Sequence, residues 1–86
     1  NKWNKIFFNE FEKMRINTNK TYANFVLLNF DNVRIDSKKV FSLLANSGIL
    51  VRRMDPYGIK NSLRVTIGKN YENKKFISKM RDIFDV

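Results

Sequence analysis

Two short apolar segments, residues 48–52 and 61–68, are separated by a turn-forming stretch, and this arrangement constrains the fold more than any other feature of the chain. The stretch between them contains Asp-Pro-Tyr-Gly at positions 55–58, a combination typical of tight turns. The two segments are therefore expected to pair as neighbouring strands of one sheet. Each carries an arginine, Arg52 and Arg64, and strand pairing can bring both guanidiniums to a shared edge. Because a planar guanidinium suits carboxylate or phosphate, the sequence predicts an anion-binding site there.

The first part of the chain shows a helical pattern followed by a strand pattern. Between residues 2 and 14, apolar side chains, many of them aromatic, recur every three or four positions, as an amphipathic helix requires. We expect these aromatic side chains to pack in the core rather than to stack on bases, because they follow one helical face. Asparagine and threonine at 17–19 break the pattern. Residues 24–30 then form a short apolar run rich in β-forming residues, which predicts a buried strand.

Two more helices are predicted from their capping residues. Asp36 or Ser37 can cap a helix that Gly48 can end in the left-handed conformation, which other residues resist. Asn70 is expected to cap a final helix, with Glu72 favourable in its first turn.

The expected order is helix, strand, helix, strand, strand, helix, with the last two strands at residues 49–53 and 63–67. A strand-helix-strand unit crosses over right-handedly and makes its strands parallel, whereas the turn at 56–58 favours an antiparallel neighbour. The third strand is therefore expected between the other two, in a small mixed sheet of about three strands. We expect an α/β two-layer sandwich with helices packed on one face, formed by a single domain over residues 1–86.

Composition argues against several classes of protein. The chain has no cysteine and no histidine, so it lacks disulfides and the usual zinc ligands, and no metal site is expected. Its apolar runs are far shorter than the roughly 20 residues of a membrane helix, so we expect no membrane association and a cytoplasmic location. The chain begins with Asn1 rather than methionine, and we expect it to be part of a longer polypeptide.

The formal net charge of +9 raises the alternative of a nucleic-acid-binding protein. The order of elements also fits a basic α/β module of the RNA-recognition kind. Against it, the lysines are scattered and accompany abundant asparagine, which favours a solvated basic surface. Residues 49–51 and 63–65 also lack the aromatic pair that stacks bases. No specific nucleic-acid partner is expected, although this alternative stays open.

Four segments follow one another in a distinctive order. They are Ala-Asn-Phe-Val-Leu at 23–27, Ser-Gly-Ile-Leu-Val-Arg at 47–52, Asn-Ser-Leu-Arg-Val-Thr-Ile-Gly at 61–68, and Glu-Asn at 72–73 ahead of a helix that contains Phe76. Together they resemble the C-terminal small domain of the fold type I pyridoxal-phosphate aminotransferases, most closely that of the histidinol-phosphate aminotransferases. The resemblance covers most of the chain from residue 22 onward.

The resemblance implies reversible transfer of an amino group between L-histidinol phosphate and 2-oxoglutarate, in histidine biosynthesis. It assigns Arg64 to the substrate's anionic group and Arg52 to the phosphate end, with Arg53 expected on the opposite face of the sheet. Asn24 and Tyr57 are weaker candidates for shaping the site. Another class I or II aminotransferase, or a threonine-phosphate decarboxylase, shares this architecture and remains an alternative.

The resemblance also implies what this stretch leaves out. In that family the lysine that carries the cofactor, the aspartate at the pyridine nitrogen and most of the phosphate cradle belong to the large domain. Pyridoxal phosphate is therefore expected in the missing large domain, and the 86-residue chain alone is expected to be inactive, with no catalytic residue of its own. Because the family's sites lie near a dimer interface, a homodimer is expected for the full-length enzyme.

Overall fold

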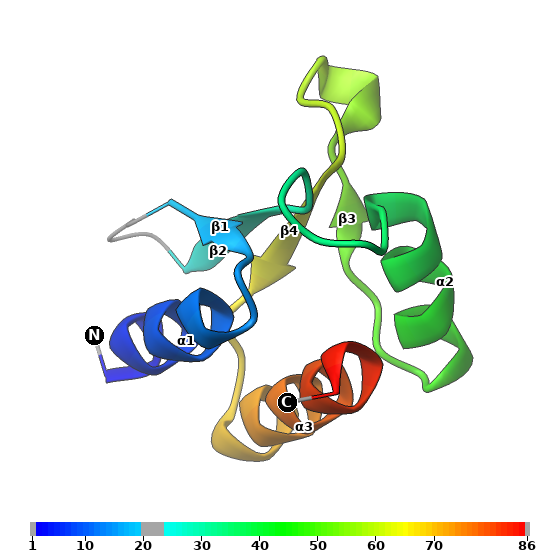
Figure 1. Ribbon diagram of the computed structural model, residues 1–86. Helices are drawn as coiled ribbons and strands as arrows, with labels where there is room; N and C mark the ends of the chain where they lie inside the picture. Colours follow the sequence, from blue (N-terminus) through cyan, green and yellow to red (C-terminus); the bar gives the residue numbers. More distant parts are fainter. Residues whose placement is uncertain (1, 20–23, 86) are drawn as a thin grey trace.

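The computed structural model describes residues 2–19 and 24–85, which form a small sheet with its helices gathered on one side (Figure 1). In chain order the elements are α1 (Lys2–Lys13), β1 (Asn17–Thr18), β2 (Phe25–Asn29), α2 (Ser37–Asn46), β3 (Arg52–Arg53), the 3-10 turn η1 (Asp55–Tyr57), β4 (Ser62–Thr66) and α3 (Asn70–Phe84). The predicted α/β class and the three predicted helices are confirmed. The sheet has one strand more than predicted.

The sheet has the strand order β1-β2-β4-β3, and every neighbouring pair is antiparallel. β4 lies between β2 and β3, as the sequence predicted. The sheet is nevertheless antiparallel rather than mixed, because β2 and β3, which run in the same direction, are separated by β4 and do not pair. The additional strand, β1, follows α1 and pairs with β2 at positions where the sequence indicated only a break in the helix.

The core lies between one face of the sheet and the helices. Along β2 the burial alternates, so that Val26 and Leu28 are buried whereas Phe25 and Leu27 are only partly buried. The strand predicted at 24–30 is therefore buried on one face only. Antiparallel sheets commonly pack one face on the core and leave the other to solvent, and here the outward positions are also largely apolar, which hid the alternation.

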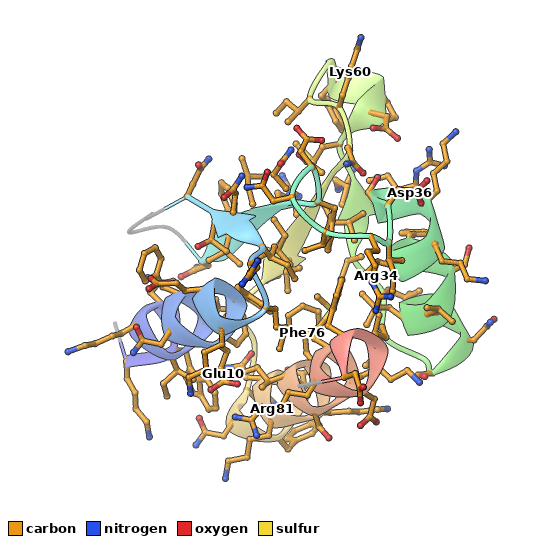
Figure 2. All side chains as sticks on the ribbon, viewed as in Figure 1. Glu10, Arg34, Asp36, Lys60, Phe76 and Arg81 are labelled. Carbon is orange, nitrogen blue, oxygen red and sulfur yellow. The ribbon has the colours of Figure 1, made fainter. Side chains whose placement is uncertain are left out.

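α1 and α3 join across the core through aromatic rings and one ion pair. Phe7 and Phe11 of α1 each have their ring centroid 5.7 Å from that of Phe76 on α3. This confirms that the aromatic face of the first helix packs in the core. Beside it, Glu10 is only 9% exposed, and its Oε1 accepts a hydrogen bond from Arg81 Nε at 2.7 Å. The same oxygen lies 2.7 Å from Arg81 Nη2 in an ion pair. Figure 2 labels Phe76 on α3, together with Glu10 and Arg81.

The caps of α2 follow the sequence closely. The Asp36 side chain accepts a hydrogen bond from the Lys39 N–H at 2.9 Å, so Asp36 is the N-cap. Gly48 follows the end of the helix with a φ of 77°, in the left-handed region. Both predicted features are confirmed.

The start of α3 differs from the prediction. Asn70 is the first helical residue, and Lys69 is the N-cap. The Glu72 carboxylate accepts the Lys69 N–H at 2.8 Å, and the buried Asn73 side chain bonds to the backbone of the preceding loop. These two side chains form the hydrogen bonds at the start of the helix. The Asn70 side-chain oxygen instead accepts a hydrogen bond from the indole N–H of Trp3 at 2.7 Å.

The strand predicted at 49–53 is shortened to Arg52 and Arg53, which pair with β4. The Ile49 N–H donates to the Leu44 carbonyl at 2.9 Å, so the start of this segment is tied to the end of α2 instead of to the sheet. The side chain of Leu50 is left 82% exposed. The two residues that do pair include one of the arginines of the predicted anion site.

Candidate anion-binding site

Arg52 and Arg64 lie directly opposite one another, as register partners of β3 and β4. Directly opposite residues of an antiparallel pair lie about 4.5–5.5 Å apart at Cα and share one face of the sheet. Leu27 of β2 is the register partner of Arg64 on its other side. The three residues form one row on the face that does not pack on the core, and the strand pairing therefore brings the two predicted arginines together.

Neither of these two arginines has an acidic partner among the residues that the structure describes. Among the described residues, the ion pairs join Lys13 and Arg81 to Glu10, and Arg53 to Asp55. Like charges at directly opposite positions destabilise a sheet. The arginine pair is therefore unfavourable for the fold by itself, and a bound anion would remove that cost.

An aromatic side chain holds each guanidinium of the pair in place. The Cζ atom of Arg64 lies 5.3 Å from the ring centroid of Phe25, a cation–π contact. The Nη1 group of Arg52 donates a hydrogen bond to the Tyr57 hydroxyl oxygen at 3.1 Å. Neither contact neutralises the positive charge, so both guanidiniums remain able to bind an anion.

Arg53 is excluded from the pair by its direction and by its partner. Its register partner is the buried Leu63, so it projects from the opposite face of the sheet, as predicted. Its Nη2 group donates to Asp55 Oδ2 at 2.8 Å, and the Asn61 N–H donates to Asp55 Oδ1 at 3.1 Å. The Arg53 guanidinium, and after it the Asn61 N–H, lower the pKa of the Asp55 carboxyl from its ordinary value of 3.8.

Of the two residues predicted to shape the site, Tyr57 contacts Arg52, whereas Asn24 is bonded through its backbone to Ile67 and has no described contact with either arginine. The Asn24 carbonyl accepts the Ile67 N–H at 2.7 Å, next to the end of β2. The structure adds two residues that the sequence did not single out, Phe25 and Thr66, which are register partners in the row beside Arg64. The alternation of outward residues in β2 was the signal for Phe25, but the apolar character of this strand concealed it.

A hollow in the surface adjoins the two arginines. Its other lining residues are Phe41, Leu50, Val51, Arg53 and Thr66. This lining combines cationic and apolar side chains with the hydroxyl group of Thr66, and the described residues that form it include no acid. It suits an anionic group attached to a less polar body.

No protein-family model matches the chain. Two proteins named histidinol-phosphate aminotransferase nevertheless align with most of it. The one from Pelagibacter ubique is 42% identical over 78 residues, which cover 90% of this chain and 22% of that protein. The one from Moorella thermoacetica is 37% identical over 76 residues, which cover 88% of this chain and 19% of that protein. The chain is homologous to part of a histidinol-phosphate aminotransferase. It spans about a fifth of the length of these two relatives.

A solved histidinol-phosphate aminotransferase has the same fold in one part of its chain. The crystal structure of the enzyme from Clostridium acetobutylicum matches 98% of this chain and 26% of its own, with a TM-score of 0.85 and 27% sequence identity. The resemblance inferred from the four sequence segments is thereby confirmed. Within residues 2–19 and 24–85, no helix has the length and apolar character needed to cross a membrane.

Proposed function

We propose that this chain is the C-terminal small domain of a pyridoxal-phosphate-dependent aminotransferase of the histidinol-phosphate type. Homology to proteins of that name over 90% of the chain supports the class of enzyme. One observation carries the proposal for the site, namely that Arg52 and Arg64 face each other on neighbouring strands, with no acidic partner among the described residues. A pair kept only for the fold would be expected to have a compensating carboxylate.

In this proposal Arg64 and Arg52 bind the anionic group of the substrate. The reaction transfers an amino group between L-histidinol phosphate, which carries a phosphate, and 2-oxoglutarate, which carries carboxylates. Both substrates must reach the same amino-group carrier, so one anion site has to accept each of them in turn. Guanidinium groups form bidentate hydrogen bonds with phosphate and carboxylate alike, so the same pair can serve both. Tyr57 and Asn24 shape its margin.

Pyridoxal phosphate would supply the electron sink for amino transfer, with a lysine of the enzyme to hold it. The lysines that the structure describes do not fit that role, because Lys79 is partly exposed and the others are exposed. A lysine that acts as a nucleophile needs an apolar pocket or a cationic neighbour to lower its pKa. We therefore place the cofactor site in the remainder of the enzyme. That the 86-residue chain alone is inactive, that the enzyme is a homodimer and that it is cytoplasmic stay predictions.

The alternatives from the sequence have less support. Another aminotransferase of class I or II, or a threonine-phosphate decarboxylase, would use the same arginine pair, and this domain does not distinguish their substrates. A nucleic-acid-binding module would need exposed aromatic side chains, but the outward positions that flank Leu27 and Arg64 in β2 and β4 include one aromatic residue, Phe25. The net charge of +9 predicts weak, non-specific binding of nucleic acid that moderate salt abolishes.

Substitution of Arg64 in the full-length enzyme tests the proposal. Arg64→Lys keeps the charge but loses the planar fork of donors, and Arg64→Ala loses both. A hydrogen bond to a charged group contributes on the order of 1.5–3 kcal/mol, so we expect kcat/KM to fall at least about tenfold in Arg64→Ala, with Arg64→Lys in between. Steady-state kinetics with L-histidinol phosphate and with 2-oxoglutarate measure this separately for each anion.

Arg34→Ala is the matched control, because Arg34 is an exposed arginine on a different surface, beside Val33 and Ile83. We expect it to keep wild-type kinetics. Cofactor binding and thermal stability are expected to stay nearly unchanged in every variant, since the contact is with substrate. Wild-type efficiency in Arg64→Ala for both substrates would remove this residue from the site.

A further inference from the structure

We infer that Tyr57 is a positioning residue of the anion site, which holds the Arg52 guanidinium on the open face of the sheet beside Arg64. The inference rests on the proposed function of the arginine pair. It assigns to the Tyr57 hydroxyl group the role of orienting one member of the pair, Arg52. The direct observation is the hydrogen bond of 3.1 Å that Arg52 Nη1 donates to the Tyr57 oxygen.

Arg52 needs such a partner because its position gives it little support. It lies on a two-residue strand at the edge of the sheet, and its side chain is exposed. A long, exposed side chain loses considerable rotamer freedom when it is held in one place to bind an anion. Tyr57 can reduce that loss by holding the guanidinium before the anion arrives, which is how preorganisation raises affinity.

The turn that carries Tyr57 is itself well fixed. The Tyr57 N–H donates to the Met54 carbonyl at 3.0 Å, and the Gly58 N–H donates to the Asp55 carbonyl at 2.9 Å. Gly58 has a φ of 81°, which glycine adopts without strain, and Pro56 limits the backbone freedom of the turn. The hydroxyl group is therefore presented by a rigid segment.

The same turn separates the two neighbouring arginines by the chemistry of their partners. Asp55 forms an ion pair with Arg53, with 2.8 Å between Asp55 Oδ2 and Arg53 Nη2, and neutralises its charge. Tyr57 accepts a hydrogen bond from Arg52 through its neutral phenol group. A carboxylate at position 57 would hold Arg52 at least as firmly, but it would cancel the charge that attracts the anion. A hydroxyl group orients the guanidinium and leaves its full charge available.

Packing does not account for Tyr57. Its side chain is 61% exposed, and it belongs neither to the buried core nor to the partly buried residues around it. Phenylalanine at this position would keep the ring and lose only the hydroxyl oxygen. The variant Tyr57→Phe therefore isolates the proposed role with little risk to the fold.

The test uses inorganic phosphate as the probe and follows its binding to the chain by NMR titration. We expect Tyr57→Phe to weaken phosphate binding by about threefold to tenfold while the unfolding temperature stays unchanged. In an Arg52→Ala background, Tyr57→Phe is expected to cause no further loss, because a positioning residue acts only through the group it holds. In an Arg64→Ala background its effect is expected to persist.

Two further variants sharpen the test. Tyr57→Glu should weaken phosphate binding more than Tyr57→Phe does, by about tenfold or more, because it keeps a partner for Arg52 and cancels its charge. Tyr71→Phe is the control, since Tyr71 is another exposed tyrosine, 68% exposed, on α3. It is expected to bind phosphate as the wild type does.

The outcomes separate this inference from the proposed function. If phosphate binding depends on Arg52 and Arg64 but Tyr57→Phe binds like the wild type, the role of Tyr57 is overturned and the anion site stands. An equal loss from Tyr57→Phe with and without Arg52 also overturns it, because Tyr57 would then act independently. If the Arg52→Ala and Arg64→Ala variants bind phosphate as well as the wild type, both proposals fail.

Discussion

The contact between α1 and α3 and the open face of the sheet use arginine in opposite ways. At the helix contact, Arg81 pairs with the nearly buried Glu10 through a hydrogen bond from Nε and an ion-pair contact from Nη2, each at 2.7 Å. On the open face, Arg52 and Arg64 face each other with aromatic partners and no acid among the described residues. The ion pair of Arg81 with Glu10 joins two helices. The charges of Arg52 and Arg64 are not neutralised and remain available to bind an anion.

This difference gives a criterion for separating structural from binding arginines in a basic chain. With 17 lysines and arginines against 8 acids, most cations in this chain have no acid of their own, so lack of a partner alone carries little information. The informative case is a pair of cations that the backbone forces together. Repulsion between them opposes folding, and the sheet keeps them adjacent through the register of Arg52 with Arg64.

Substitution of Glu10 tests the contact between α1 and α3, where the arginine has an acidic partner. It is expected to have the largest effect on stability. Glu10→Ala leaves Arg81 without its acid, and removing one partner of a buried pair is costly. Because the Arg81 side chain is 49% exposed, water can replace part of the lost interaction. We therefore expect the free energy of unfolding to fall by about 1–2 kcal/mol, as measured by urea denaturation.

Glu12→Ala is the control for this change, because Glu12 is an exposed acid on the same helix. We expect it to alter the free energy of unfolding by less than about 0.5 kcal/mol. The double variant Glu10→Ala/Arg81→Met should lose less than the sum of the two single changes, since both remove the same interaction. If Glu10→Ala is as stable as the control, the ion pair does not join the helices as we describe.

Substitution on the open face is expected to change stability far less. Arg64→Ala removes a repulsion with Arg52 of about 0.2–1 kcal/mol. It also removes the contact with Phe25, which at an exposed site contributes about 0.5–1 kcal/mol. These effects are similar in size and opposite in sign, so we expect a net change within about 0.5 kcal/mol in urea denaturation without phosphate.

Phosphate should then distinguish the wild type from this variant. A ligand that binds only the folded state stabilises it in proportion to the logarithm of its concentration over its Kd. The wild type is expected to gain stability from phosphate beyond that from sodium chloride at equal ionic strength, and Arg64→Ala is expected to gain less. A loss of stability in Arg64→Ala as large as that in Glu10→Ala would make this arginine structural and remove the contrast.

The features that could be predicted from the sequence depend on short stretches of chain. The aromatic repeat of residues 2–14 gave α1, and Asp36 with Gly48 gave the limits of α2, because spacing and capping act within a few residues. The approach of Arg52 to Arg64 followed from the turn between their strands. The role of these arginines in binding stays a prediction.

The features that could not be predicted depend on contacts between distant segments. Asn70 was predicted to cap α3, but its oxygen accepts a hydrogen bond from Trp3, which lies 67 positions away. β1 has two residues and exists because β2 offers it an edge. Phe25 contacts Arg64 only once β2 and β4 are in register. The first two features leave no local signal in the sequence, and the alternation that would have indicated Phe25 was concealed by the apolar character of β2.

The last prediction concerns Asp55, which resembles Glu10 in having an arginine partner but lies in the turn next to the open face, and its effect is expected to be the smallest. Arg53 lowers the pKa of the Asp55 carboxyl from 3.8, so the unfolded chain takes up a proton at a higher pH than the folded chain does. The stability that Asp55 contributes is therefore complete above its ordinary pKa and is lost as the pH falls through the lower pKa of the folded state. We expect the difference in unfolding free energy between wild type and Asp55→Asn to be constant from pH 7 to about pH 5 and to shrink below about pH 4. Urea denaturation of both proteins across this range measures the difference, which cancels the general effect of acid on a chain with a net charge of +9.

Asp36→Asn is the control, because Asp36 caps α2 without a basic partner in the described ion pairs. A difference that grows as the pH falls would mean that the ionised carboxylate of Asp55 opposes folding, and the account of how Asp55 neutralises Arg53 in this turn would then be wrong.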